Sequence, residues 1–600
     1  MLLGDVRWLL RHHLGAFLTA VLLGQGALTL LILPLSNRLF TWVLASADID
    51  GISQESLGKL LTSPVALMAL GLNGLIVALA LFAQIAVLTS LAHRANEGAP
   101  LTVHEVLREV IRSGRALLSW QVLLFGVYGF VLLPLAEMSI VSDLTAHIAI
   151  PRFISDELMK TGGGIALYAG ALFLIAYLAL RLSLTQSALL RGDRTVLAAM
   201  RTSLRLTRQG QLRFFWGIVV IGAAVALPTG LLAIATALPV WLSSSGSEDS
   251  VALVSGFALA TAHLVVFLGG GFLSAASTGY AVARHRRVSA LPMRQPTRGD
   301  DEAAAGRSRV RHRVLAGGVA ALTSLTVLGH GVVLTGALAL DEDPADTLVI
   351  AHRGYAAAAV ENSLDALRDA ATAGAELSEL DVQETRDGEF VVFHDATLSR
   401  LAGDSRRVSE LTVAELRSLT LHQRGYRSVI PTLAEYVAEA DRLNIRLLIE
   451  LKPTGDEAPR FAERVTEQLG ELDPERRHLL QSLDRPLINQ ISELDPTRKT
   501  AAVVGLQLGL LPETDAEIIA IESWSYSDAM LGQAVAAGKQ IFVWTVNEDD
   551  QIRALLARRV HGIITDRVPE AIGFRQLVGS PQDPMGRYLD TLLLELTPLT

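Results

Sequence analysis

The 600-residue sequence contains no cysteine. Disulfide bonds, thiolate metal sites and a cysteine nucleophile are therefore excluded. Charged residues make up 19% of the chain and aromatic residues 6%. Soluble domains average about 25% charged residues, so part of this chain must be poor in charge. The formal net charge is −9, and this acidic balance argues against nucleic acid as a partner.

The plentiful residues are apolar, and they are concentrated before about residue 340. A transmembrane helix needs about 20 consecutive, mostly apolar residues. Seven runs meet this requirement: 14–34, 64–92, 116–136, 163–189, 214–241, 252–280 and 314–340. Seven such runs cannot all be buried in the core of one globule. We therefore predict a multi-pass protein of the cell membrane, with an all-α first half embedded in the lipid bilayer.

Arginine is distributed unevenly among the loops between these runs. It is abundant in loops 93–115, 190–213 and 281–313, and scarce in loops 35–63 and 242–251. Loops rich in arginine stay in the cytoplasm, so consecutive loops alternate between the two sides of the membrane. An odd number of spans then places the residues after 340 outside the cytoplasm.

The residues after 340 alternate between strand patterns and helical patterns. Strand patterns such as Thr347–Ala351 and Ile445–Leu451 are separated by helical patterns such as Ser363–Ala373. This alternation over 260 residues is typical of an α/β TIM-type (β/α)8 barrel. The stretch from His394 to about Ile430 does not fit the alternation, and we expect it to be an excursion from the barrel.

These patterns divide the chain into five parts. They are a membrane domain of six transmembrane helices (1–280), an arginine-rich cytoplasmic linker (281–313), a seventh transmembrane helix (314–340), the barrel (345–577) and a C-terminal tail (578–600). The first span could instead be a signal peptide, because Ala45-Ser46-Ala47 resembles a cleavage site. Cleavage there would not change the topology of the later spans.

Carboxylates occur at the C-terminal ends of two predicted strands, where barrel enzymes build their sites. Glu379 and Asp381 are two residues apart on one strand, so both side chains point to the same face. Together they can bind a hard divalent cation through oxygen. Glu450 and Lys452 repeat the spacing on a later strand, which adds a third carboxylate and an ammonium group suited to a phosphate oxygen.

Two histidines complete this group of residues. His352 closes the first strand, and His394 ends a β-rich run after the turn dipeptide Asp387-Gly388. A phosphodiester is anionic, so attack on it requires charge neutralisation, which a metal ion supplies. One histidine can accept the proton of the nucleophile while the other protonates the leaving alkoxide. The group as a whole predicts metal-assisted cleavage of a phosphodiester.

These residues resemble the motifs of the glycerophosphodiester phosphodiesterase family, of the bacterial type fused to a membrane domain. The motifs stand here as His352-Arg353-Gly354, Val360-Glu361-Asn362-Ser363, Glu379-Leu380-Asp381, His394-Asp395, Pro431-Thr432-Leu433, Glu450-Leu451-Lys452, Trp544-Thr545-Val546-Asn547 and Ile563-Ile564-Thr565-Asp566. The second departs from the family's Pro-Glu-Asn-Thr at its first and last residues and keeps the polar pair.

The resemblance implies a barrel fold and a role for each residue. His352 and His394 would be the acid/base pair. Three carboxylates would bind the cofactor, a divalent cation that is Ca²⁺ or Mg²⁺: Glu379, Asp381 and Glu450. Three residues would contact the substrate: Arg353, Lys452 and Trp544.

We therefore predict a metal-dependent enzyme whose extracytoplasmic domain hydrolyses glycerophosphodiesters to sn-glycerol 3-phosphate and an alcohol. Three alternatives remain at this point. One is a lysophospholipase D-like enzyme that hydrolyses membrane lipids such as a lysolipid, and another is a phospholipase C-like barrel. The third is a non-catalytic membrane transporter or sensor. The sequence leaves the headgroup, the oligomeric state and the role of the membrane domain beyond anchoring open.

Overall fold

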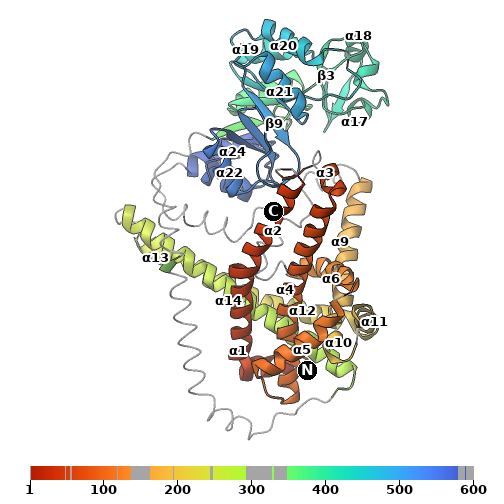
Figure 1. Ribbon diagram of the computed structural model, residues 1–600. Helices are drawn as coiled ribbons and strands as arrows, with labels where there is room; N and C mark the ends of the chain where they lie inside the picture. Colours follow the sequence, from red (N-terminus) through yellow and green to blue (C-terminus); the bar gives the residue numbers. More distant parts are fainter. Residues whose placement is uncertain are drawn as a thin grey trace. The chain divides into compact units, whose positions relative to one another are not determined.

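The computed structural model divides the chain into two compact units (Figure 1). It describes residues 2–47, 49, 51–53, 57–117, 119–136, 162–193, 195–243, 248–291, 328–329, 347–357, 359–457, 459–578 and 588. The helical unit comprises Met1–Ala47 and Ser63–Asp341. The barrel unit comprises Asp48–Thr62 and Glu342–Thr600.

The described part of the helical unit consists of helices. They are α1 (Leu2–Ala27), the π-helix η1 (Leu28–Ile32), α2 (Leu33–Ser46), α4 (Pro64–Glu97), α5 (Val103–Gly114), η2 (Arg115–Leu117), α6 (Gln121–Ala136), α9 (Gly162–Leu182), α10 (Thr185–Arg191), α11 (Val196–Leu206), α12 (Gln211–Ala235), α13 (Ala237–Ser243) and α14 (Glu248–Val288). The ends of α4 follow from local sequence. The Ser63 side chain accepts from the Ala66 N–H, Pro64 opens the first turn, and Gly98 ends the helix with φ of 67°.

Four of these helical segments are long and apolar enough to cross a membrane: Pro64–Glu97, Gly162–Arg191, Gln211–Ser243 and Leu253–Val288. They coincide with four of the seven predicted runs. The run 14–34 lies within α1, η1 and α2, and the run 116–136 lies within η2 and α6. The run 314–340 falls outside the described residues except for 328–329. The count of seven spans therefore stays a prediction.

All five predicted loops of the helical unit contain helical residues, and α2 and α11 are two examples. Helix α2 continues to Ser46, so the predicted loop 35–63 begins later than expected. Helix α11 lies inside the predicted loop 190–213 and begins at the cap residue Thr195. Its hydroxyl accepts from the Ala198 N–H at 3.2 Å. Both helices are too short or too polar for a span, which is why a search for long apolar runs does not find them.

The barrel unit contains a closed barrel of eight parallel strands, as predicted. In spatial order these are β2 (Leu348–Ala351), β3 (Leu377–Glu384), β7 (Arg446–Leu451), β8 (Leu479–Ser482), β9 (Thr500–Val504), β11 (Ile518–Glu522), β12 (Gln540–Trp544) and β13 (Gly562–Thr565). Pairing of β13 with β2 closes the ring. Strand β4 (Phe390–Val392) adds to β3 in the antiparallel sense.

Helices connect the strands and cover the barrel. They are α16 (Leu364–Ala373), α19 (Leu433–Leu443), α20 (Phe461–Leu472), α21 (Arg485–Leu494), α22 (Asp528–Ala536), α23 (Asp549–Ala557) and α24 (Val568–Val578). Every residue of β3 is buried, as expected for a parallel strand covered on both faces. Inside the ring, Ile350, Leu448 and Phe542 belong to one apolar cluster, so the barrel is filled and its chemistry is confined to its ends.

The stretch after His394 is an excursion from the barrel, as predicted. It contains α17 (Ser399–Ala402), η4 (Val408–Glu410), α18 (Val413–Arg417), β5 (Leu421–Gln423) and β6 (Tyr426–Ser428). Its apolar side chains form a cluster of their own that includes Phe393, Leu416 and Ile430. Because it has its own core, the excursion can hold side chains over the carboxyl end of the strands.

An unexpected element joins the barrel unit from the far end of the sequence. Strand β1 (Gly51–Ser53) pairs in the antiparallel sense with β10 (Gln507–Gly509), in the loop that follows β9. The short helix α3 (Leu57–Thr62) follows β1. The segment between α2 and α4 therefore contributes a strand to the barrel unit, which the sequence pattern did not predict.

Candidate active site

Three carboxylates meet at the carboxyl end of two neighbouring strands. Asp381 of β3 lies opposite Glu450 of β7 in the parallel register, and Glu379 lies one pleat before Asp381 on the same face. All three are buried, with 2%, 1% and 8% exposure for Glu379, Asp381 and Glu450. One oxygen from each lies within 4.8 Å of the others. This is the spacing of ligands around one cation, and the oxygen donors suit a hard one.

Two cationic side chains and an amide face these carboxylates. The Lys452 ammonium lies 2.8 Å from Glu450 Oε1 and 3.1 Å from Asp381 Oδ1. Arg353 donates its backbone N–H to Glu379 Oε2 at 2.8 Å, and its Nε lies 3.4 Å from Asp381 Oδ2. Asn362 donates its amide to Asp381 Oδ2 at 2.7 Å. The structure thus brings five predicted residues together and adds Asn362 to them.

The pKa values of the carboxylates move in opposite directions. Burial raises the pKa of Glu379 well above its ordinary value, and the negative charges of Asp381 and Glu450 raise it further. Burial alone would also raise the pKa of Asp381, but Lys452 and other nearby cations lower it below its ordinary value. Three carboxylates thus share two cations, and a further positive charge would relieve their repulsion.

The two histidines are held in the same way by different carboxylates. His352 Nδ1 lies 2.9 Å from Asp566 Oδ1, and His394 Nδ1 lies 2.7 Å from Asp395 Oδ1. An ionised carboxylate can only accept, so each Nδ1 carries a proton and donates it to its aspartate. Asn547 donates to the other oxygen of Asp566 at 2.6 Å. Both histidines are therefore fixed in orientation and tautomer.

Burial alone would raise the pKa values of both supporting aspartates. Contacts outweigh it in each case: His352 lowers the pKa of Asp566 below its ordinary value, and His394 and Arg400 do the same for Asp395. Both aspartates are therefore ionised at neutral pH.

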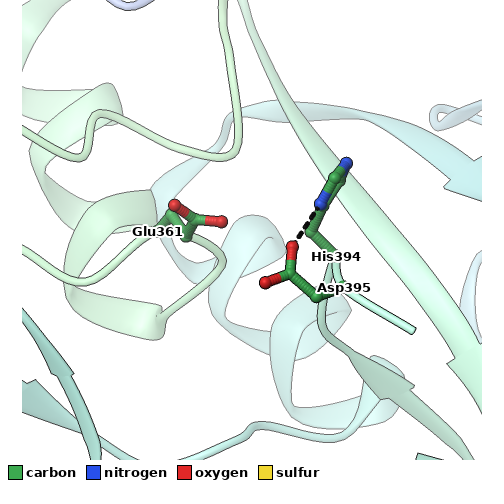
Figure 2. A group of neighbouring side chains, drawn as sticks. All are labelled: Glu361, His394 and Asp395. Carbon is green, nitrogen blue, oxygen red and sulfur yellow. Dashed lines mark hydrogen bonds and ion pairs between the residues drawn. The ribbon is translucent and has the colours of Figure 1, made fainter. Parts of the chain in front are cut away.

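Figure 2 shows a second group of possible ligands, Glu361, His394 and Asp395, with the two carboxylates pointing toward one another. The Arg400 guanidinium lies between them. It donates to Asp395 at 2.6 and 2.9 Å and to Glu361 at 2.6 and 3.0 Å. Glu361 also accepts from Arg353 at 3.0 Å. A guanidinium thus fills the position that a metal ion would need.

The contacts of Glu361 with Arg353 and Arg400 change the pKa of its carboxyl group. Burial favours the neutral acid, but Arg400 and Arg353 lower the pKa of Glu361 to about 2. Gln383 of β3 supports the same turn, because its amide lies within 3.0 Å of the carbonyl oxygens of residues 393, 394 and 395. His394 is therefore held by its own neighbour Asp395 and, through Arg400, by Glu361.

A cleft of about 890 Å³ opens beside these residues. His394, Glu450 and Lys452 line it, and Leu483 and Pro486 form part of its wall. Trp544, at the end of β12, is half-buried and donates its indole N–H to the Ala520 carbonyl at 2.9 Å. Among the described residues it forms no hydrogen bond with the other predicted site residues, so its role in substrate binding stays a prediction.

Several site residues escaped the sequence analysis. Asn362, Asp395 and Asp566 lie inside the quoted motifs, and their positions beside Asp381, His394 and His352 give them roles that the motifs alone did not. Arg400 and Gln383 carry no such signal. Arg400 belongs to the excursion, where no periodic pattern indicates which way a side chain points.

Comparisons with known proteins give the same partition of the chain. Residues 8–290 match the model described as the membrane domain of glycerophosphoryl diester phosphodiesterase. Residues 352–570 match the glycerophosphoryl diester phosphodiesterase family.

Two relatives match the barrel unit over nearly their whole length. YhdW of Bacillus subtilis (strain 168), which carries the name of the same family, is 32% identical over 231 residues, 36% of this chain and 93% of that protein. A glycerophosphodiester phosphodiesterase of Bacillus altitudinis is 29% identical over 244 residues, 38% of this chain and 98% of that protein. The chain therefore belongs to the glycerophosphodiester phosphodiesterase family, as a phosphoric diester hydrolase with an N-terminal membrane domain.

Proposed function

We propose that the barrel unit hydrolyses glycerophosphodiesters to sn-glycerol 3-phosphate and an alcohol, and that it requires Ca²⁺ or Mg²⁺. The observation that carries this proposal is the convergence of Glu379, Asp381 and Glu450 within 4.8 Å. Three buried carboxylates are costly to bring together unless a cation joins them. Bound there, the cation would neutralise charge on the phosphodiester and lower the pKa of a hydroxyl or water.

The chain's own cations hold the substrate phosphate. Lys452 lines the cleft, and its ammonium already bridges Asp381 and Glu450, so it lies beside the cation site. Arg353 is fixed by Glu361 and Asp381. Because their carboxylate partners hold both side chains in place, little conformational entropy is lost when a phosphate oxygen binds.

The histidines move the protons. With Nδ1 of each engaged by an aspartate, one Nε2 accepts the proton of the nucleophile and the other donates a proton to the leaving oxygen. His394 lines the cleft together with Leu483 and Pro486. We assign the leaving alcohol to this side and therefore make His394 the acid and His352 the base.

A substrate panel with and without chelator tests this proposal. Purified full-length protein should release glycerol phosphate from glycerophosphocholine, lose this activity in EDTA and regain it with Ca²⁺ or Mg²⁺. Activity that persists after complete chelation would overturn the metal requirement. A free phosphorylated headgroup as product would show a phospholipase C-type cleavage instead.

A second candidate substrate is a lysolipid, cleaved as by a lysophospholipase D. The cleft of about 890 Å³ falls near the upper end of the usual range for ligand pockets, about 300–1,000 Å³. Leu483 on its wall is 47% exposed and offers an apolar surface beside the leaving-group side. A higher kcat/KM for lysophosphatidylcholine than for glycerophosphocholine would favour this candidate.

We further propose that the helical unit is a seven-span membrane domain and that the barrel unit is extracytoplasmic. The segment 48–62 supports this orientation. It belongs to the barrel unit, joins α2 to α4, and carries three acidic residues and one lysine. Because this segment is part of the barrel unit, the two share one side of the membrane. Its low content of positive charge puts that side opposite the arginine-rich loops.

The absence of native cysteine makes the orientation easy to test. Ser418→Cys introduces a single thiol at an exposed position of the barrel unit, and Gln209→Cys introduces one at an exposed position of an arginine-rich loop. A membrane-impermeant maleimide added to intact cells or spheroplasts should label only the first variant. Labelling of Gln209→Cys alone would mean the opposite orientation.

A further inference from the structure

The helical unit contains a cavity of about 430 Å³ that its family membership does not explain. Helices α1, α12 and α14 line it, and its walls are apolar, with Leu10 from α1, Val225 from α12 and Phe272 from α14. Two charged residues line the cavity, Arg7 and Arg11. An apolar cavity that is also lined by two guanidinium groups has the polarity of a site for an anionic amphiphile.

The helices that line the cavity are closely packed against α14. A Cβ atom on Gly279 of α14 would lie 2.8 Å from a methyl group of Leu9 on α1. A Cβ atom on Gly217 of α12 would lie 1.9 Å from the Tyr280 hydroxyl of α14. The absence of a side chain at these two glycines therefore lets α1 and α12 pack closely against α14. Both helices pack against α14, and all three line the cavity.

The two arginines lie on the same face of α1. Arg7 and Arg11 are four residues apart on α1, which puts them on one face of the helix. Both are exposed, and among the residues that the structure describes neither guanidinium has a carboxylate partner. Nearby Arg287 of α14, in contrast, is paired with Asp5 at 2.7 Å. An unpaired pair of guanidinium groups beside an apolar cavity is complementary to a phosphate that carries an acyl chain.

We propose that this cavity binds an anionic phospholipid, with its phosphate at Arg7 and Arg11 and an acyl chain along Leu10, Val225 and Phe272. This site is separate from the diester hydrolysis proposed for the barrel unit. Its position at the arginine-bearing end of α1 corresponds to basic pockets between membrane helices, which recognise lipid headgroups.

Charge complementarity also argues against residues 314–340, the predicted seventh span, as the occupant of the cavity. The predicted seventh span, 314–340, is preceded by Arg309, Arg311 and Arg313, and no acidic residue occurs between positions 303 and 340. Bringing that basic end to Arg7 and Arg11 would place like charges together. A phospholipid phosphate supplies the opposite charge.

Native mass spectrometry of the full-length protein, titrated with phosphatidylglycerol or phosphatidylcholine, tests the proposal. We expect phosphatidylglycerol to bind at least about tenfold more tightly. The double variant Arg7→Gln/Arg11→Gln should lower phosphatidylglycerol affinity by roughly thirtyfold and leave phosphatidylcholine affinity nearly unchanged. The matched control is Arg201→Gln/Arg205→Gln, which removes two exposed arginines four residues apart on α11.

A second variant tests the cavity without changing its charge. Ala224 is exposed on α12 and lines the cavity, so Ala224→Phe should fill it and reduce phosphatidylglycerol binding while the arginines remain. Equal binding of the two lipids, or equal losses in the two double-arginine variants, would show that these arginines act only as general surface charge. Unchanged binding in Ala224→Phe would also overturn the proposal, because the acyl chain would then lie elsewhere.

Discussion

The two units differ in where their large apolar side chains lie: buried in the barrel unit and often exposed in the helical unit. In the barrel unit they are inside, as for Leu380, Ile449 and Ile521, all at 0% exposure. In the helical unit many are outside, as for Met68 at 69% and Leu231 at 68%. Exposure to water would cost about 25 cal/mol per Å² of apolar surface, but exposure to lipid does not. The surface of the barrel unit therefore suits water, and the surface of the helical unit suits lipid.

The two units also differ in how they bury charge. In the helical unit neighbouring charges alternate in sign: Glu97 lies between Arg286 at 2.7 Å and Arg191 at 3.0 Å. In the barrel unit like charges are brought together, at Glu379, Asp381 and Glu450. Alternation stabilises helix packing, whereas crowding of like charges opposes folding. A cluster of like charges therefore indicates a functional site, whereas charges of alternating sign are explained by their contribution to stability.

The largest expected effect comes from removing one crowded charge. Glu379→Gln should lower kcat/KM for glycerophosphocholine by about a thousandfold or more, because the variant loses a ligand of the proposed cation. Its unfolding free energy should stay the same or rise, because like-charge repulsion is relieved.

The matched control for this comparison is Glu97→Gln in the helical unit. It should lower the thermal stability of the protein while activity per folded molecule stays within about twofold of wild type. If Glu379→Gln proved as destabilising as Glu97→Gln, the contrast between crowded and alternating charges would be wrong.

The second effect separates the two histidines. His394→Ala should reduce hydrolysis of glycerophosphocholine by about 10²–10⁴-fold, the usual contribution of a general acid or base. With an activated p-nitrophenyl leaving group the loss should be much smaller, because a good leaving group needs no proton. His352→Ala should impair both substrates. Equal losses of His394→Ala on both substrates would assign the general acid elsewhere.

The third effect concerns Arg400, which joins Glu361 to the aspartate behind His394. Arg400→Gln should lower kcat about tenfold or more, since outer residues that orient a catalytic group commonly matter by 10–100-fold. Arg400→Lys should restore part of the activity. A loss that appears only in KM would argue that Arg400 binds substrate rather than positioning His394.

The same contact predicts how stability depends on pH. The pKa of Glu361 is about 2 in the folded protein, against an ordinary value of 4.5. The folded state therefore favours the ionised form, and this stabilisation, about 3 kcal/mol, is present above pH 4.5 and is lost as pH falls toward 2. Arg400→Gln should flatten this dependence and lower stability at neutral pH. Acid titrations of thermal unfolding for the two proteins measure the difference.

The smallest effect on activity is expected from a disulfide that cross-links β1 to β10. Ile52 and Leu508 are register partners in this ladder, and no native cysteine competes with an introduced pair. Ile52→Cys/Leu508→Cys should form a disulfide on oxidation and change activity by less than about twofold. Ile52→Cys with Ser418→Cys is the mismatched control. Equal cross-linking of both pairs would show that β1 is not held at β10.

The barrel and much of its site could be predicted from the sequence because their signals are local. Strands such as β7 are continuous apolar runs, and Glu379 and Asp381 share a face through the period of two alone. The ends of the predicted strands identified the histidines and Lys452 as candidates, and the family resemblance gave each a role. Helix α21 and strand β10 were not predicted, and β10 is only three residues long.

The roles of Arg400 and β1 could not be predicted, because contacts between distant segments create them. Arg400 is one of many arginines in the sequence, and its guanidinium matters because folding places it between Glu361 and Asp395. Strand β1 is three residues long, and it is a strand only where the backbone of β10 offers it hydrogen bonds.

The sequence by itself determined which solvent each half requires, that no thiol chemistry occurs, and which carboxylates and histidines end the barrel strands. These properties depend on composition and on short periods, so no distant contact is needed to establish them. The tertiary structure decided which charges crowd and which alternate. It also decided which aspartate holds each histidine, and where apolar side chains leave a cavity beside Arg7 and Arg11. These properties depend on the closure of the barrel and on helix packing, which bring together residues that are far apart along the chain.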